Sequence, residues 1–196
     1  MITHELMPEA ISNRPGRVIV LNGTSSAGKS SIATELLDVL EDVWYHVKID
    51  AFRRMLPHRD WTDEAYLPVL QRTVLGFHRA VAGMAAGGNN VVADYVLGER
   101  WRLADALDVL KDVPVLFVGV RCSLPELERR ETARGNRRIG QAAMQFPVVH
   151  AHGLYDVEVD TERNSPRECA LLIRDRLAAG PPTAFDQLRR RQPIDF

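Results

Sequence analysis

A glycine-rich stretch with one lysine carries the clearest chemical signal in this chain of 196 residues. Residues 23–30 follow the pattern Gly-x-x-x-x-Gly-Lys-Ser, between an aliphatic run and an amphipathic segment. This is the strand, loop and helix setting that a phosphate-binding P-loop requires. Gly23 and Gly28 allow backbone angles and a close approach that a Cβ atom would prevent. Backbone N–H groups and the positive end of the following helix can then face one phosphate group.

Two residues of this loop have separate expected roles. We expect Lys29 to reach the β- and γ-phosphates of ATP, and the hydroxyl of Ser30 to bind Mg²⁺. A Gly/Ser-rich turn that binds nothing is the alternative, and the flanking strand and helix argue against it. The residues expected to contact the nucleotide are Gly23, Thr24, Ser25, Ser26, Ala27, Gly28, Lys29, Ser30 and Ser31.

Apolar runs that alternate with helical patterns position this loop. We expect strands over residues 17–22, 44–50, 90–96, 113–122 and 155–160. We expect helices over residues 29–40, 51–56, 68–86, 99–110, 123–135, 141–150 and 165–179. This alternation predicts a three-layer α/β kinase domain with a five-stranded parallel sheet. Ligands of such domains bind outside the carboxyl ends of the strands.

Asp50 ends the second expected strand, at the same sheet edge as the loop. A carboxylate there could accept the proton of a substrate hydroxyl that attacks the γ-phosphate. It could instead orient Mg²⁺ through water, or cap a helix that begins at Ala51.

Asp94 ends the third expected strand. It could contact Mg²⁺ through water, or it could be a turn residue at the end of a strand. Tyr95 and Glu99 follow it closely and are candidates for substrate contact.

Four arginines gather around Gly135, after the fourth expected strand: Arg130, Arg134, Arg137 and Arg138. The planar guanidinium suits contact with a transferring phosphoryl group, and small kinases carry such groups on a lid. A solvated basic helix face is the alternative for any single arginine. We expect the cluster to form an Arg-bearing lid.

We expect an N-terminal arm over residues 1–16, a kinase domain over 17–179 and a tail over 180–196, with Arg189–Arg191 solvated. The polar and aromatic segment 58–67 reads as a loop or a cap over a site. His150 and His152 receive no role.

The composition is that of an ordinary globular protein. The net charge of −1 gives no indication of a nucleic-acid or membrane partner. The first residues do not match a signal peptide, and the two cysteines match no metal or disulfide pattern. We therefore expect a cytoplasmic protein that binds neither nucleic acid nor membranes. Whether it forms a homo-oligomer stays open.

Several further motifs occur together with the P-loop. They are Leu21–Ser30, Glu99–Arg102, Val118–Cys122, Arg130–Arg137, Gln145, Val148–His150, Tyr155–Thr161 and Glu168–Ala170. With them, residues 17–179 closely resemble the chloramphenicol phosphotransferases. The resemblance implies a shikimate-kinase-like fold and ATP-dependent transfer of the γ-phosphate to a hydroxyl of the antibiotic, which inactivates it.

The resemblance also assigns residues. It implies a catalytic carboxylate at Asp50, lid arginines at Arg134 and Arg137, and a loop near the adenine at 161–165. Residues 58–75 depart from the family pattern, with Trp61, Tyr66 and several charges in a segment that would face the acceptor.

The expected function is that of a small-molecule O-phosphotransferase acting on chloramphenicol or a similar compound. A nucleoside, a sugar or another natural product is the alternative acceptor. A regulatory NTP-binding switch is a further alternative. The position of Asp50 argues against the switch, because a switch needs a positioned water rather than an acceptor site.

Overall fold

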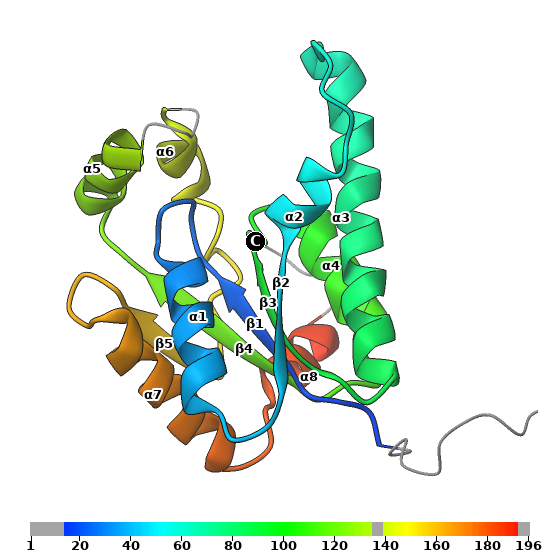
Figure 1. Cartoon of the computed structure of the whole chain (residues 1–196), viewed down its shortest axis with the longest axis vertical. Helices are drawn as coiled ribbons and strands as arrows, with labels where there is room; N and C mark the ends of the chain where they lie inside the picture. Colours follow the sequence, from blue (N-terminus) through cyan, green and yellow to red (C-terminus); the bar gives the residue numbers. More distant parts are fainter. Residues whose placement is uncertain (1–13, 135–138, 192–196) are drawn as a thin grey trace, which may run out of the picture.

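The computed structural model describes residues 14–134 and 139–191, in which strands and helices alternate along the chain (Figure 1). The strands are β1 (Val18–Asn22), β2 (Trp44–Lys48), β3 (Asn90–Tyr95), β4 (Val115–Arg121) and β5 (Val157–Asp160). The helices are α1 (Lys29–Val39), α2 (Ile49–Arg54), α3 (Asp63–Ala86), α4 (Arg100–Val109), α5 (Leu124–Arg134), α6 (Gln141–Gln145), α7 (Pro166–Ala178) and α8 (Ala184–Arg190).

The strands form one parallel sheet of five, in the order β2-β3-β1-β4-β5. Strand β1 lies at the centre, and its last residue, Asn22, is in register with Tyr95 of β3 and Gly119 of β4. The carboxyl ends of the three central strands therefore meet at one edge. The expected α/β fold with a five-stranded parallel sheet is confirmed.

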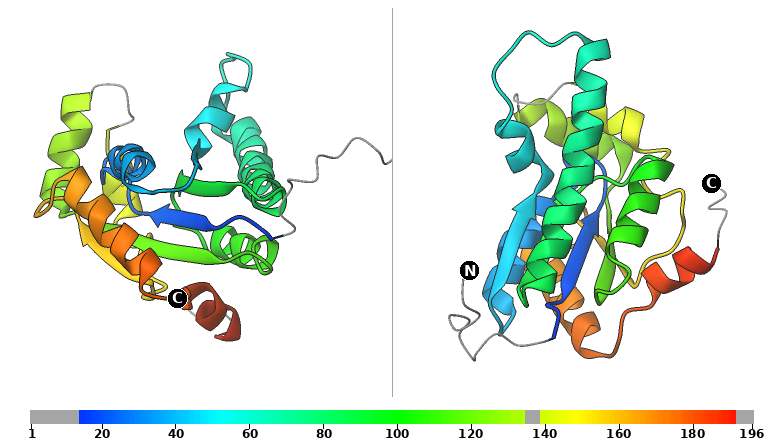
Figure 2. Two further views of the ribbon diagram at one scale, coloured as in Figure 1. Left: turned by 60° about the horizontal axis from the view of Figure 1, so that its bottom comes forward. Right: turned by 90° about the vertical axis from the view of Figure 1, so that its right-hand side faces the viewer.

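Helices cover both faces of the sheet (Figure 2). Side chains of α3, α4 and α8 pack on one face, and those of α1, α5 and α7 on the other. Strand β1 is fully buried, with Val18 and Val20 facing the first cluster and Ile19 and Leu21 the second. Burial on both faces explains why this strand is continuously apolar. No helix within residues 14–134 and 139–191 has the length and apolar character needed to cross a bilayer.

Two helical arms flank the carboxyl end of the sheet (Figure 1). One consists of α2, the loop after it and the first turns of α3; the other consists of α5 and α6. Helix α3 begins at Asp63, whereas the sequence placed its start at Pro68. The hydroxyl of Thr62 accepts a hydrogen bond from Ala65 N (3.3 Å), and two acidic residues follow in the first turn. This N-cap starts the helix earlier, and Pro68 lies inside it.

The end of the chain is more structured than expected. Residues 184–190, which we expected in a tail, form α8. Phe185 and Leu188 of this helix are buried against the sheet, and Phe185 packs edge-on against Phe117 of β4. Arg189 donates a hydrogen bond to the carbonyl oxygen of Leu107 (3.0 Å), so it is not a freely solvated side chain. The apolar pair of α8, three residues apart, accounts for the difference.

Candidate active site

The loop between β1 and α1 has the tight backbone that its glycines predict. A Cβ atom at Gly23 would lie 2.5 Å from the carbonyl oxygen of Val120, so only glycine fits there. Gly28 has a φ of +88° and directly precedes α1. Ser26 also has a positive φ, of 65°, which is rare for a residue with a side chain. The helix N-terminus therefore opens directly from a sharply turned loop, as a phosphate site requires.

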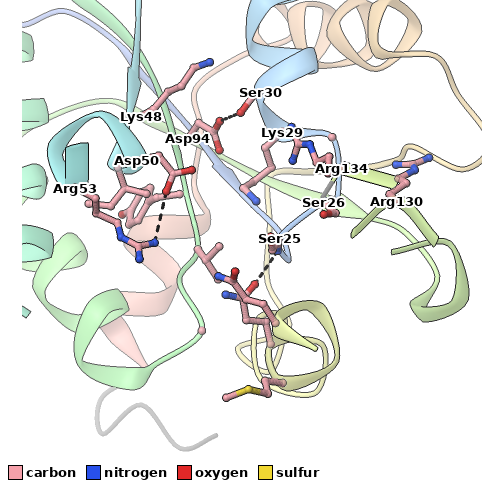
Figure 3. A pocket seen from close by; sticks show the side chains of 18 of the residues that line it. Ser25, Ser26, Lys29, Ser30, Lys48, Asp50, Arg53, Asp94, Arg130 and Arg134 are labelled. Carbon is pink, nitrogen blue, oxygen red and sulfur yellow. Dashed lines mark hydrogen bonds and ion pairs between the residues drawn. The ribbon is translucent and has the colours of Figure 1, made fainter. Parts of the chain in front are cut away.

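Lys29 lies over this loop. Its ammonium group donates hydrogen bonds to the carbonyl oxygens of Gly23 and Thr24, both at 2.8 Å. The residue is only 8% exposed and lines a cavity beside the loop. The ammonium group is thus held beside the loop and is largely shielded from solvent (Figure 3).

Asp94 reaches the first turn of α1 from the end of β3. The hydroxyl of Ser30 donates to its carboxylate at 2.5 Å, and Nε2 of His46 lies 3.5 Å from the same oxygen. Burial alone would raise the pKa of Asp94, but the neighbouring His46, Lys29 and Ser30 together hold this pKa below its usual value. A hydroxyl and an ionised carboxylate thus lie side by side, and such oxygens suit Mg²⁺.

Asp50 lies two residues beyond the end of β2, in the first turn of α2, whereas the sequence placed it at the end of a strand. The N-cap residue of α2 is Lys48, and no side-chain hydrogen bond caps the start of this helix. The cap role considered for Asp50 is therefore wrong. Its carboxylate lies 3.6 Å from the guanidinium of Arg53, one turn further along the helix.

One cavity of about 840 Å³ connects these groups (Figure 3). Its walls come from the P-loop, α2, the start of α3, the end of β3, and helices α5 and α6. The residues singled out from the sequence that line it include Ser25, Ser26, Gly28, Lys29, Ser30, Ser31, Asp50, Asp94, Tyr95 and Glu99. Gly23, Thr24 and Ala27 belong to the loop but are not among the residues that line the cavity.

The arginines of the second arm are only partly described. Arg130 and Arg134 line the cavity, while Arg137 and Arg138 lie outside the described residues. The guanidinium of Arg130 donates hydrogen bonds to Thr161 Oγ1 (3.0 Å) and to the carbonyl oxygen of Thr161 (2.8 Å). The hydroxyl of Thr161 in turn donates to the carbonyl oxygen of Ala27 in the P-loop (3.0 Å). The loop after β5 therefore joins the base of this arm to the P-loop.

Sequence reasoning gave no chemical role to Lys48, Arg53 and Gln145, which also line the cavity. The side-chain oxygen of Gln145 in α6 accepts a hydrogen bond from the backbone N–H of Ser25 (2.7 Å). Its presence in a family motif was the signal that could have found it. The spacing of Arg53, three residues after Asp50, was the corresponding signal on α2.

Glu131 is a buried carboxylate that sequence reasoning missed. It is 2% exposed and accepts hydrogen bonds from the backbone N–H groups of Gly140 (2.7 Å) and Ala142 (3.1 Å). Glu131 lies before residues 135–138 and its two partners lie after them, so it fixes the start of α6 to α5. The position of Gln145 against the P-loop depends on this contact.

Glu131→Gln is expected to lower the free energy of unfolding by about 1–3 kcal/mol, because each backbone N–H bonds to a different carboxylate oxygen and the amide replaces one of them with an NH₂ donor. Chemical denaturation measures this change. Glu128→Gln is the matched control, since Glu128 is exposed on the same helix, and it should change stability by less than about 0.5 kcal/mol. Equal stability of the two variants would contradict the bracing role of Glu131.

A buried polar network lies below the P-loop. The side-chain amide of Asn22 donates to Tyr155 Oη and to the carbonyl oxygen of Val149, both at 2.8 Å. His150 and His152 contact the same Tyr155 hydroxyl, at 2.6 and 3.0 Å. Burial, together with the charge of Arg121, lowers the pKa of His150 to about 3 and that of His152 to about 4. Both histidines are thus neutral scaffold residues, and neither lines the cavity.

These lowered pKa values make stability depend on pH. The unfolded chain binds a proton at each histidine near the ordinary pKa of 6.5, whereas folded His152 does so only near 4. Stability therefore rises with pH through this window and is lost as the pH falls. We expect each histidine to lower the free energy of unfolding by about 2 kcal/mol between pH 7 and pH 5.

Denaturation at both pH values measures this slope. His152→Gln should flatten it, whereas His58→Gln, in an exposed loop, should leave it unchanged. An unchanged slope in the His152 variant would show that this imidazole is not held neutral by the fold.

The family of the chain is decided by its match to known proteins. A family model described as "Chloramphenicol phosphotransferase-like protein" matches residues 16–178. The chain belongs to this family. A Mycobacterium tuberculosis protein named "Putative O-phosphotransferase", found in two strains, is 34% identical over 200 residues, which cover 90% of this chain and 89% of that protein. The resemblance stated from the motifs is confirmed.

Solved structures with a similar fold extend the comparison. A Mycobacterium tuberculosis APS kinase in complex with AMPPNP and APS has a TM-score of 0.67 at 17% identity, covering 84% of this chain and 99% of its own. A gluconokinase from Sinorhizobium meliloti has a TM-score of 0.58 at 19% identity, covering 92% and 100%. The fold is therefore that of P-loop kinases. Together with the family, it makes this protein a kinase-type O-phosphotransferase.

Proposed function

We propose that the protein transfers the γ-phosphate of ATP to a hydroxyl group of chloramphenicol or a similar antibiotic, and so inactivates it. The observation that carries this proposal is the shared cavity, in which Asp50 and the P-loop residues Lys29 and Ser30 line one space. Family membership points to the same acceptor class. Much of the cavity wall beyond Asp50 is apolar, which suits the body of such a compound; it includes Leu67, Leu70, Val74, Val96, Met144 and Val148.

Asp50 is the proposed general base. It would accept the proton of the acceptor hydroxyl as that oxygen attacks the γ-phosphate. Asp50 lies on α2, whereas Ser30 lies in the first turn of α1 and Asp94 near the end of β3, so the proposed base and the proposed metal ligands come from different elements. The carboxylate is 32% exposed, so an acceptor can reach it.

The P-loop and Asp94 are proposed to hold ATP with Mg²⁺. The residues fit this group, because a hydroxyl and an ionised carboxylate lie 2.5 Å apart beside the N-terminus of α1. Ser30 would bind the metal, and Asp94 would contact it through water. The bound metal neutralises phosphate charge, and Lys29 adds its own charge at the β- and γ-phosphates.

The arm formed by α5 and α6 is proposed to supply arginines over the transferring phosphoryl group. Arg134 and Arg137 are the candidates for this contact, since Arg134 lines the cavity at the end of α5. Arg130 is held by Thr161 at the side of the cavity where a nucleotide base would lie.

An acceptor screen tests the proposal. Purified protein is mixed with Mg-ATP and chloramphenicol, related antibiotics, nucleosides or sugars, and ADP formation is measured with the product mass. We expect ADP formation to rise with chloramphenicol or a similar compound, which then gains one phosphoryl group. Stimulation by a nucleoside or a sugar alone would reassign the acceptor. ADP formation that no acceptor raises above the hydrolysis rate would overturn the transferase proposal.

A further inference from the structure

The carboxylate of Asp50 forms an ion pair with a neighbour on its own helix. Arg53 Nη1 lies 3.6 Å from Asp50 Oδ1, one turn along α2. Both side chains are partly exposed, at 37% and 32%. An isolated pair of this kind fixes little, because two flexible side chains keep most of their freedom. The effect of Arg53 therefore depends on what else holds it.

Arg53 is held by the second element of the same arm. Its Nε donates a hydrogen bond to Tyr66 Oη on α3 at 3.0 Å, and its guanidinium carbon lies 5.9 Å from the centre of that ring. Tyr66 in turn contacts Trp61 in the loop before α3, at a ring distance of 6.1 Å. A guanidinium that donates a hydrogen bond to α3 and forms an ion pair within α2 has few remaining orientations.

Phe52, the residue before Arg53, also attaches α2 to α3. Phe52 packs edge-on against the fully buried Phe77 of α3, at a ring distance of 5.3 Å. Helix α2 is thus attached to α3 at two consecutive side chains, one apolar and one polar. Asp50, Arg53 and Tyr66 all line the cavity that the P-loop shares.

We propose that Arg53, held by Tyr66, is a positioning residue that directs the Asp50 carboxylate at the acceptor hydroxyl. The inference rests on the proposed role of Asp50 as the base. In that step the hydroxyl proton passes to Asp50, the acceptor oxygen bonds to the γ-phosphorus, and the bond from this phosphorus to ADP breaks. Arg53 stays protonated throughout and acts only through Asp50. A role of Arg53 in binding the acceptor directly is the competing explanation.

The kinetics of three variants separate these explanations. We expect Arg53→Ala to lower kcat about tenfold, because the base is misdirected. The KM for ATP and the KM for the acceptor should each change less than about twofold, because both substrates still bind. Arg53→Lys should recover part of this loss, because it keeps the charge near Asp50 but not the fork of donors. Tyr66→Phe, which removes only the tethering hydroxyl, should lower kcat about threefold to fivefold.

Arg54→Ala is the matched control. Arg54 has the same charge on the same helix but is exposed and does not line the cavity that contains the P-loop; it lines the neighbouring pocket that Asp50 and Arg53 also reach. Its variant should keep kcat within about twofold. A similar loss in the Arg53 and Arg54 variants would mean that general charge, rather than positioning, is measured.

A double-variant cycle decides whether Arg53 acts through Asp50. In the Asp50→Asn background, adding Arg53→Ala should change the residual rate less than about twofold, because no carboxylate is left to position. A further tenfold loss there would contradict the proposal. A rise in acceptor KM with kcat unchanged in the single variant would also contradict it and favour direct binding.

A crystal structure of Tyr66→Phe tests the tether without any substrate. We expect Arg53 to leave its contact with Asp50 and the carboxylate to adopt more than one orientation. Unchanged positions of both side chains would overturn the tether whatever the activity. If the unmodified protein phosphorylates no acceptor, the proposed function fails instead, and this crystal structure still decides how Asp50 is held.

Discussion

Asp50→Asn is expected to lower the rate of phosphoryl transfer by about a thousandfold while nucleotide affinity changes less than about threefold. General bases contribute 10²–10⁴-fold to rate, and asparagine cannot take the proton of the acceptor hydroxyl. Nucleotide affinity should survive because Asp50 lies on α2, whereas the P-loop and the Ser30–Asp94 pair lie at the start of α1. Single-turnover transfer and equilibrium ATP binding measure the two quantities.

Asp63→Asn is the control for this prediction. Asp63 is a carboxylate in the same cavity, at the start of α3, and it has no proposed part in the reaction. Its variant should keep the rate within about threefold. An Asp50→Asn protein that transfers phosphate at the rate of the unmodified protein would remove Asp50 from the role of base. Equal losses in both variants would point to the total charge of the cavity instead.

Lys29→Met is expected to lower kcat by about a hundredfold or more and also to weaken ATP binding. The ammonium group is buried and lies 2.8 Å from two carbonyl oxygens of the P-loop. In the proposed role, Lys29 would stabilise phosphate charge in the ground state and more strongly in the transition state, so both parameters should change. Methionine keeps much of the apolar stem, which limits the effect on packing.

The stability of this variant has to be measured beside its activity. The carbonyl oxygens of Gly23 and Thr24 lose a donor in it, so a small fall in the thermal unfolding midpoint is expected. Activity lost while ATP affinity and unfolding stay unchanged would assign Lys29 to the transition state alone. Activity within about threefold of the unmodified protein would contradict any role of Lys29 at the phosphates.

The fold could be predicted from the sequence because its central strands are largely apolar and its helices are separated by glycine, proline and capping residues. The P-loop was predictable for a different reason: its chemistry needs two glycines, a lysine and a hydroxyl at fixed spacing. Both signals are local. They therefore also placed Asp50 and Asp94 near the loop, where parallel strands end together.

The parts that could not be predicted depend on contacts between distant segments. The start of α3 depends on one capping hydroxyl, Thr62, which is a weaker signal than the proline six residues later. The packing of Phe185 in α8 against Phe117 joins residues far apart in the chain. Likewise, nothing near Arg53 in the sequence shows that Tyr66 accepts its hydrogen bond.

The fate of the γ-phosphate is the most direct test of whether the protein transfers it to an acceptor hydroxyl rather than to water. The unmodified protein is incubated with Mg²⁺, ATP labelled at the γ-phosphate and chloramphenicol, with the related antibiotics of the acceptor screen in parallel. We expect the label to appear in the acceptor as a phosphate ester, and Asp50→Asn to form this product about a thousandfold more slowly. Label recovered only as inorganic phosphate with every acceptor would contradict this expectation.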